Sequence, residues 1–434
     1  MFDVLDWREL LLAEARQLDE SGYEPALGAE ELARLADSAV PECAELEAAY
    51  VSLAQSKPRV GADDVSPESL EDIEAMSSPS PAETVPPGRA DDGLLAAWLG
   101  RCAGCNLGKP VEGFGWNRRK LRRYLEAAGA YPIADYLPVL DPMPDGLVFN
   151  PAWRETTRGR VQAMARDDDL DYTVLGLELL ERRGTSFSTA DVGELWLELL
   201  PFSKTYTAER AAYRNLVRGL APPQTATYRN PYREWIGAMI RADIFGYVCP
   251  GDPGAAARLA YRDATLSHTG NGVYGAMWAA ALVAAAFCAD SPSTAIERSL
   301  SVIPPGSRLA RAVRDQLDAY SRGIGWDDAM ACAEQRLGHY HWIHAINNAS
   351  VVAAALLWGD GDFMRTVGYA VEGGLDTDCT GATAGSVCGA LVGTAALPEQ
   401  LVAPLEDTLH SAVFGYEPSR ISELARRTAA LRVG

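Results

Sequence analysis

Apolar residues recur at helical spacing near the start of the chain. In the segments 3–19 and 29–54, leucines such as Leu5, Leu10 and Leu32 alternate with many acidic residues at the period of an amphipathic helix. This pattern predicts two or three amphipathic helices, which form an N-terminal helical extension over residues 1–56.

The composition changes between residues 57 and 92. This stretch is rich in Pro, Ser, Asp and Glu, and the run SSPSPAETVPPG at 77–88 fits no regular element. We expect a linker, or a strap that lies across the main domain.

From residue 93 to the end, Ala- and Leu-rich segments of helical length dominate, and β-branched alternation is almost absent. No repeat of fixed period is present, which argues against a solenoid. The pattern predicts an all-α protein with a single large compact helical domain over residues 93–434. The expected helical segments are 93–105, 169–183, 208–218, 253–262, 273–289, 307–321, 347–358, 361–372, 381–396, 401–413 and 418–431.

One segment is long and apolar enough to raise the question of a membrane span. Residues 269–289, TGNGVYGAMWAAALVAAAFCA, carry no charge. Their Ala and Gly content favours a buried core helix, so we expect no membrane partner.

Composition and charge narrow the class of protein. The chain has 434 residues, of which 48% are hydrophobic and 23% charged, as in ordinary globular proteins. Its formal net charge of −20 repels phosphate backbones, so we expect no nucleic-acid partner. The first residues lack the basic start and the cleavage site of a secretory signal, which favours a cytoplasmic protein. Nothing in the sequence indicates an oligomeric state.

The cysteines are predicted to be buried thiols, because most of the eight lie in apolar, Ala-rich sequence. Cys102 and Cys105 form a CxxC pair, but no second such pair and no nearby His pair completes a zinc site.

Four carboxylates are crowded at the start of one predicted helix. The segment RDDDLDYT places Asp167, Asp168, Asp169 and Asp171 directly before an apolar run. The helix dipole and an N-cap explain one or two of them. Four like charges this close repel one another unless something neutralises them, which points to a cation.

A second cluster, far along the chain, repeats this arrangement. In EGGLDTDCTG, Gly373 and Gly374 are expected to end one helix, and Asp376 and Asp378 precede the next. Two Asp-bearing helix starts that face each other would supply the oxygen ligands that Mg²⁺ prefers. The two clusters indicate a site for one or two metal ions; a pair of solvated helix caps is the alternative.

Glycines recur every four residues, at 381, 385, 389 and 393, in the helix after the second cluster. One face of this helix is nearly free of side chains. We therefore expect another backbone to approach it closely and to hold the preceding acidic loop rigid.

A basic cluster lies between residues 114 and 160, where the helical signal weakens. It is interpreted as a solvated helix face or as a site for a phosphorylated ligand. Its members are Arg118, Arg119, Lys120, Arg122 and Arg123.

In five motifs, which occur in the same order, the sequence resembles the ADP-ribosylglycohydrolase family. The motifs are GRCAGCNLGKPVEG (100–113), DDDLDYT (167–173), IGAMIRADIFGYVCPGDP (236–253), SHTGNGVYGAMWAAA (267–281) and GGLDTDCTGATAGSVCGALVG (373–393). The resemblance covers residues 93–400 and implies an all-α hydrolase with a cleft for ADP-ribose. It also implies two Mg²⁺ or Mn²⁺ ions at the base of that cleft.

The resemblance implies a set of metal ligands. The family motif Thr-Asp-Asp corresponds to residues 167–169, and Asp-Thr-Asp-Thr corresponds to residues 376–379. The chain departs from this pattern at Asp167, which adds a charged oxygen, and at Cys379, whose soft sulfur suits Mg²⁺ poorly. Thr380 is expected to replace the missing hydroxyl. The implied ligands are Asp167, Asp168, Asp169, Asp376, Asp378 and Thr380.

Further roles follow from the same resemblance. Glu112 corresponds to a Glu on a mobile segment near the scissile bond, and Glu112, Asp168 and Asp378 are the candidates for proton transfer. Arg241 is expected to brace the site, and Asn347 and Asn348 to line its wall. The residues expected to contact the ribose and phosphates are His268, Gly270, Asn271, Gly272 and Tyr274.

Hydrolysis of a ribosyl bond passes through an oxocarbenium-like state, so a water must be positioned and the changing charge stabilised. The sequence thus predicts a metal-dependent glycosidase that removes ADP-ribose from a modified acceptor. One alternative is a hydrolase of a ribosylated nucleotide or other small metabolite. The other is a catalytically silent homologue with a binding or structural role.

Overall fold

The computed structural model describes residues 7–37, 44–59 and 66–433. Helices account for nearly all of its regular structure, and the described strands are two pairs of two residues each. The all-α prediction is confirmed. The strand pairs are β1 (Tyr23–Glu24) with β2 (Lys57–Pro58) and β3 (Thr408–Leu409) with β4 (Ser419–Arg420).

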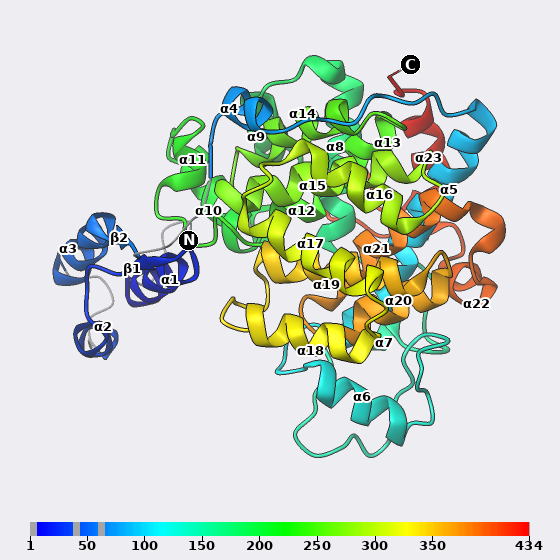
Figure 1. Ribbon diagram of the computed structural model, residues 1–434, viewed down its shortest axis with the longest axis horizontal. Helices are drawn as coiled ribbons and strands as arrows, with labels where there is room; N and C mark the ends of the chain where they lie inside the picture. Colours follow the sequence, from blue (N-terminus) through cyan, green and yellow to red (C-terminus); the bar gives the residue numbers. More distant parts are fainter. Residues whose placement is uncertain (1–6, 38–43, 60–65, 434) are drawn as a thin grey trace.

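Two long antiparallel helices, α5 (Pro87–Gly108) and α21 (Thr377–Val392), pack against each other in the main domain (Figure 1). A Cβ atom added to the glycine at 381, 385 or 389 would collide with a backbone oxygen of α5. The predicted close approach is therefore confirmed for these three glycines. Gly393 differs, because it ends α21 with a φ of +78°.

Helix α15 (Gly270–Ala286) is the most completely buried helix of the core. All its residues from Asn271 to Ala286 are buried, which confirms the predicted core helix. It packs against α12 (Gly237–Ile240), α13 (Asp243–Val248), α14 (Pro253–Ala264) and α16 (Pro292–Ser299). No helix in the described part of the chain has the length and apolar character needed to cross a membrane.

The remaining helices surround this core (Figure 1). Two of them, α6 and α7, lie in the largely irregular stretch between α5 and α8. They are α6 (Arg118–Ala127), α7 (Trp153–Thr156), α8 (Asp168–Arg183), α9 (Thr189–Leu199), α10 (Thr207–Val217), α11 (Gln224–Thr227), α17 (Arg308–Ser321), α18 (Trp326–Leu337), α19 (Ala345–Gly359), α20 (Phe363–Glu372), α22 (Glu399–Val402) and α23 (Ile421–Ala429).

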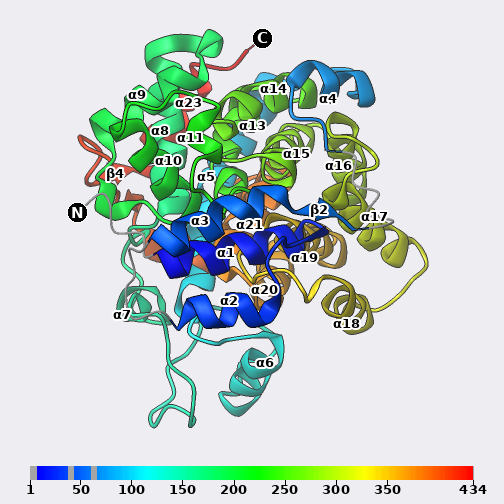
Figure 2. The same ribbon diagram turned by 90° about the vertical axis from the view of Figure 1, so that its left-hand side faces the viewer.

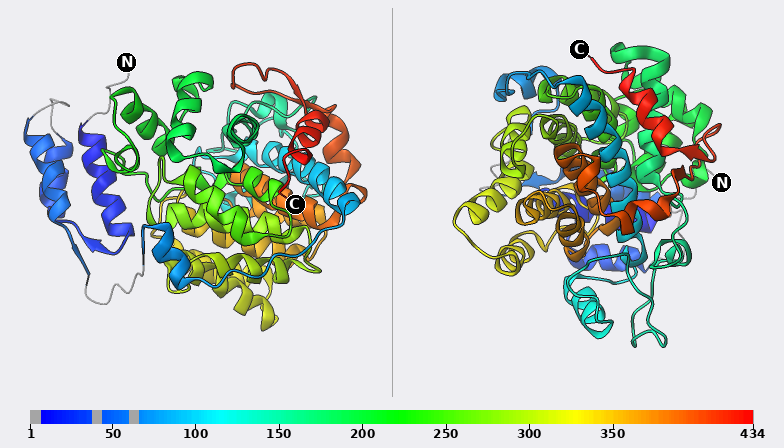
Figure 3. Two further views of the ribbon diagram at one scale, coloured as in Figure 1. Left: turned by 90° about the horizontal axis from the view of Figure 1, so that it is seen from above. Right: turned by 90° about the vertical axis from the view of Figure 1, so that its right-hand side faces the viewer.

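The N-terminal helices form a small unit at one end of the molecule (Figures 2 and 3). They are α1 (Trp7–Glu20), α2 (Ala29–Ala36) and α3 (Ala44–Ser52). The leucines at 11, 35, 46 and 53 are buried together as a separate apolar cluster, so the predicted amphipathic helices are confirmed where the chain is described. Leu5 lies outside the described residues.

The Pro- and Ser-rich segment lies against the main domain. It contains one short helix, α4 (Leu70–Met76), and then runs without regular structure to α5 (Figure 3). The amide of Ser78 donates to Ser301 O at 3.0 Å, and the amide of Glu83 donates to Gly251 O at 2.9 Å. These contacts fasten the segment to a 3₁₀ turn and to a loop of the core.

The prediction of a helix over residues 401–413 is wrong. Only a short helix and a 3₁₀ turn, Ala403–Leu405, precede Glu406 and Asp407, both of which have positive φ. The Asp407 carboxylate accepts the amide of Ser422 at 2.7 Å, at the start of α23. The leucines at 401, 405 and 409 are still buried, although they belong to three different short elements, which are α22, the 3₁₀ turn and β3.

Candidate active site

Both predicted acidic clusters lie at helix starts, and the structure brings them together. Asp167 is the N-cap residue of α8, where its side chain accepts the amide of Asp169 at 3.0 Å. Asp376 is the N-cap residue of α21, and Asp378 lies in the first turn. Because helix N-termini favour anions, both clusters occupy positions where carboxylates are stabilised.

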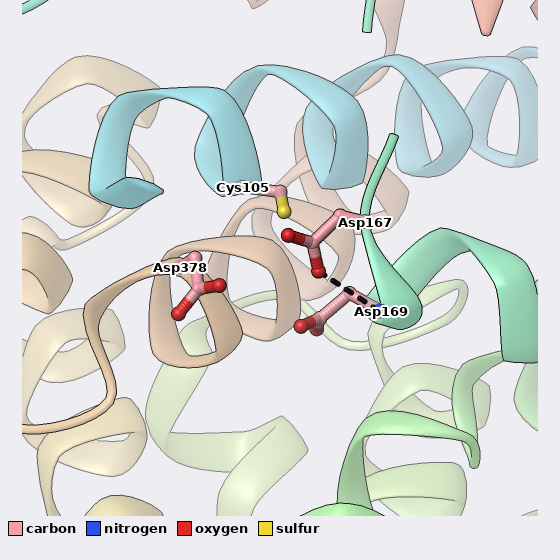
Figure 4. A group of neighbouring side chains, drawn as sticks. All are labelled: Cys105, Asp167, Asp169 and Asp378. Atoms are coloured by element: carbon pink, nitrogen blue, oxygen red, sulfur yellow. Dashed lines mark hydrogen bonds between the residues drawn. The ribbon is translucent and has the colours of Figure 1, made fainter. Parts of the chain in front are cut away.

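Figure 4 shows how three of these carboxylates converge. Asp167, Asp169 and Asp378 point toward one another, and the sulfur of Cys105 from α5 lies beside them. One potential ligand atom from each of the four lies within 4.8 Å of the others, and a second such group contains Asp376, Asp378 and Cys379. Asp378 belongs to both groups and therefore lies at the centre of the site.

The packing of α5 on α21 sets this geometry. At the end of α5, the Thr377 hydroxyl donates to Gly108 O at 2.9 Å. The amide of Asp376 donates to the Asn348 side chain at 3.1 Å, which gives this predicted wall residue a positioning role. The acidic loop is thus fixed from two sides.

Arg101 of α5 is a fully buried cation beside Asp169. It was not among the residues singled out from the sequence. It pairs with Asp243 at 2.8 Å and with Asp169 at 3.2 Å, and it donates to the Thr173 hydroxyl at 3.0 Å. The only sequence signal for it is an arginine within a strongly apolar helix, where a buried charge requires partners.

Lys109 is the second cation that the sequence analysis missed. Its ammonium group lies 2.7 Å from Glu112, 2.5 Å from Asp167 and 2.7 Å from Asp378. Burial opposes ionisation, but these carboxylates raise the lysine pKa well above its ordinary value. Although burial acts in the other direction, Lys109 lowers the pKa of Asp167.

Glu112 follows the turn after α5 and is 24% exposed. It accepts a hydrogen bond from the Asn150 side chain at 2.8 Å. Burial, with the nearby charge of Asp378, raises its pKa to about 7, although Lys109 opposes the shift. Glu112 therefore exchanges a proton near neutral pH, as a group that transfers protons requires.

The buried carboxylates fit a divalent cation. Asp169 Oδ2 and Asp378 Oδ1 are buried and accept no hydrogen bond from the described residues. Burial raises the pKa of Asp169 well above its ordinary value, and burial together with Asp378 does the same for Asp376. A divalent cation would take these carboxylate oxygens as its ligands and would remove the repulsion between the carboxylates.

The two cysteines at the site are neutral thiols. Burial, followed by the neighbouring aspartates, raises the pKa of both Cys105 and Cys379 well above the ordinary value. Thr380 donates its hydroxyl to Asp376 O at 2.9 Å and lies within 3.2 Å of Ala370 O. Its predicted metal contact stays a prediction.

The other aspartates of the first cluster differ in environment. Asp168 is only partly exposed. The partial burial of its carboxyl group and the nearby charge of Asp167 raise its pKa well above the ordinary value. Asp171 pairs with Arg166 and accepts the Ser411 hydroxyl at 2.8 Å. It caps a loop and takes no part in the convergent group.

The predicted substrate-binding segment lies beside a cavity of about 410 Å³. His268, Gly270 and Tyr274 line this cavity. None of the six candidate carboxylates lines it; these are Glu112, Asp167, Asp168, Asp169, Asp376 and Asp378. His268 is buried, and burial lowers its pKa well below the ordinary value. Asn271 and Gly272 are also buried, so the proposed substrate contacts of this segment stay a prediction.

Arg241 braces the core next to this segment. Its guanidinium pairs with Glu209 and Asp263 and donates to the Ser267 hydroxyl at 3.1 Å. All of these partners are buried, so the group acts as a structural clamp on the residues before His268.

The basic cluster lies on α6 and lines a cavity of about 1050 Å³. Arg118 and Arg122 pair with Asp327, whereas Arg119 and Arg123 form no ion pair with any described residue. The backbone of Arg118 packs directly on Gly374, two residues before Asp376. Asn347, a predicted wall residue, also lines this cavity.

Comparison with known proteins supports the resemblance. The sequence model of the ADP-ribosylglycohydrolase family matches residues 86–433. The chain belongs to this family. Family membership assigns it to the glycohydrolases of the ADP-ribosylglycohydrolase superfamily and supports an ADP-ribosylated substrate. The match leaves α1 to α4 outside the family region.

No curated protein matches this sequence. A solved structure described as an "ADP-ribosylglycohydrolase-related protein complex" is 19% identical, with a TM-score of 0.48, and the match covers 79% of this chain and 98% of that chain.

Proposed function

We propose that this chain is a metal-dependent hydrolase that removes ADP-ribose from a modified acceptor. The observation that carries the proposal is the buried, convergent group of carboxylates where α5, α8 and α21 meet, in a chain of the ADP-ribosylglycohydrolase family. Asp168, Asp169, Asp376 and Asp378 would hold Mg²⁺ or Mn²⁺. The bound metal would supply positive charge that polarises a water and orients the ribose hydroxyls.

The chain's own residues account for the other steps. Glu112 has the protonation state and the access to solvent needed to move a proton at neutral pH, ahead of Asp168 and Asp378. Asn150 orients its carboxylate. Because the transition state develops positive charge on the ribose, the surrounding carboxylates stabilise it electrostatically.

The cavity beside α6 is our candidate site for the phosphate groups of the substrate. It adjoins the segment that leads to Asp376, and Arg119 and Arg123 contribute cations without ion-pair partners among the described residues. Arginine binds phosphate oxygens through paired hydrogen bonds. None of the six candidate carboxylates lines this cavity, so the substrate would have to extend past residues 373–375 to bring its ribose to the acidic group. The cytoplasm remains the compartment in which we expect this reaction.

A turnover assay tests the proposal. Purified chain is incubated with ADP-ribosylated Arg and Ser peptides, free nucleotides and nucleosides, with Mg²⁺, with Mn²⁺ or with EDTA. We expect metal-dependent release of ADP-ribose from a peptide, and loss of both release and Mn²⁺ binding in Asp378→Asn. Turnover of small molecules alone would favour the metabolite hydrolase, and no turnover of any substrate would favour the silent homologue.

A further inference from the structure

Lys109 occupies the position of a cation within the acidic group. A lysine ammonium has three N–H donors and no acceptor. The Lys109 nitrogen lies 2.5 to 2.7 Å from carboxylate oxygens of three separate segments, Glu112, Asp167 and Asp378, and it donates a hydrogen bond to Asp378 at 2.7 Å. A metal ion bound by the same three oxygens would lie almost where the nitrogen lies, so the two cannot be present together.

The backbone holds this lysine in place. Lys109 opens the 3₁₀ turn that follows α5, and its side chain is only 15% exposed. The carbonyl before it, Gly108 O, accepts the Thr377 hydroxyl at 2.9 Å, and Pro110 O accepts the amide of Asn150 at 2.9 Å. With both neighbours fixed, the ammonium group is directed into the site and away from solvent.

We propose that the Lys109 ammonium group serves as a built-in cation, so that this site binds one divalent ion and not two. The inference rests on the proposed metal-dependent function and revises the two ions that the family resemblance implies. Asp169, Asp376 and Asp378 would hold the single ion, and Asp167 would serve the lysine and not the metal.

The unpaired oxygens support this division. Asp378 contacts Lys109 through Oδ2, while its Oδ1 is buried without a hydrogen-bond partner among the described residues. Asp169 Oδ2 is buried without such a partner as well; Asp167 Oδ2 also lacks such a partner but lies 2.5 Å from the lysine nitrogen, so its neighbour is the ammonium charge. Asp378 would therefore offer one oxygen to the lysine and the other to the ion.

Counting bound ions on the full chain tests the proposal. Mn²⁺ is titrated by calorimetry and by electron paramagnetic resonance, without substrate, into the unaltered chain and into Lys109→Met, which keeps the length of the side chain and removes its charge. We expect one isolated ion in the unaltered chain and two magnetically coupled ions in the variant, since ions of a paired site lie about 4 Å apart. Lys109→Arg keeps the charge and should bind one.

Two coupled ions in the unaltered chain would overturn the proposal, as would an unchanged number in a folded Lys109→Met. A second comparison does not depend on that variant. Asp167→Asn and Asp169→Asn are matched in size, and Asn also caps a helix well. We expect Asp167→Asn to retain Mn²⁺ within about tenfold in affinity and Asp169→Asn to lose far more. Equal losses would assign Asp167 to the metal and refute the built-in cation.

These measurements also separate this inference from the proposed function. One bound ion without hydrolysis of any ribosylated substrate would leave the inference standing and remove the proposed activity. No bound ion at any Mn²⁺ concentration would remove both.

Discussion

Glu112 is the carboxylate of the site whose surroundings best suit proton transfer. Asn150 and Lys109 hold its Oε2 oxygen, and its pKa is raised to about 7. We expect Glu112→Gln to lower kcat by roughly 10²- to 10⁴-fold with little change in KM, because proton transfer contributes in the transition state. Steady-state kinetics measures both constants.

Glu155, an exposed carboxylate near this loop, offers a control for Glu112. Glu155→Gln should leave both constants unchanged. An effect of Glu112→Gln confined to KM would show that Glu112 binds substrate and does not transfer a proton.

The raised pKa of Glu372, at the end of α20, leads us to expect that the stability of the fold depends on pH. Burial raises its pKa to about 7, although Arg122 opposes the shift. Because the folded state holds this proton more tightly than the unfolded state, the contribution of Glu372 to stability is complete below about pH 4 and declines up to about pH 7. We expect Glu372→Gln to lose this decline and to be more stable than the unaltered chain at pH 8, by on the order of 2 kcal/mol.

Urea unfolding at pH 5 and pH 8 measures this effect. The relevant quantity is the difference between the two proteins, since other buried carboxylates titrate in both. If the free energies of unfolding of the unaltered chain and of Glu372→Gln differed by the same amount at pH 5 and at pH 8, Glu372 would titrate normally.

At the scale of elements, α5 and α21 behave as one unit because glycines allow their backbones to touch. A Cβ on Gly385 would meet Gly100 O. We expect Gly385→Ala to destabilise the fold by about 1–3 kcal/mol, since neither backbone has room to move in a packed core. Metal affinity should fall as well, because both helices end at the acidic group.

Gly88→Ala in α5 is the matched control for this substitution. Nothing lies within 4 Å of the added Cβ, so stability should be unchanged or slightly higher, as alanine favours a helix. Thermal unfolding of the two variants gives the comparison. Equal stability would contradict the requirement for close approach of α5 and α21.

At the scale of the whole molecule, ionic contacts join the N-terminal helices to the main domain. Arg233 forms two bonds with Glu14 of α1, at 2.8 and 2.9 Å. The buried Glu20 accepts the amide of His341 at 2.8 Å, and its carbonyl accepts from Arg308 at 2.8 Å. These contacts reach a loop before α15 in the sequence and, after it, the start of α17 and the loop before α19.

We expect Arg233→Ala to loosen this junction, because the mostly buried Glu14 loses its partner. Hydrogen exchange over residues 7–20 should become faster by at least tenfold, while exchange in α15 stays unchanged. Arg34→Ala is the control, since its pair with Glu45 is exposed and lies within the extension. Equal exchange in both variants would show that the Arg233 contact does not hold α1.

The sequence by itself determined the helical class, the buried character of α15 and the location of both acidic clusters at helix starts. Each of these features depends on the order of residues over a few helical turns, which periodicity and capping express directly. The same local rules failed at residues 401–413, where buried leucines at helical spacing belong to a short helix, a 3₁₀ turn and a strand instead of one helix.

Only the tertiary structure decided how the charges of the site are balanced. Lys109 and Asp378 are 269 positions apart, and Arg101 and Asp243 are 142 apart. No local pattern links such residues, because the packing of α5 on α21 and α8 brings them together. Long-range packing likewise placed His268 beside one cavity and the basic residues of α6 beside another, next to the segment that leads to Asp376, and none of the candidate carboxylates lines either cavity.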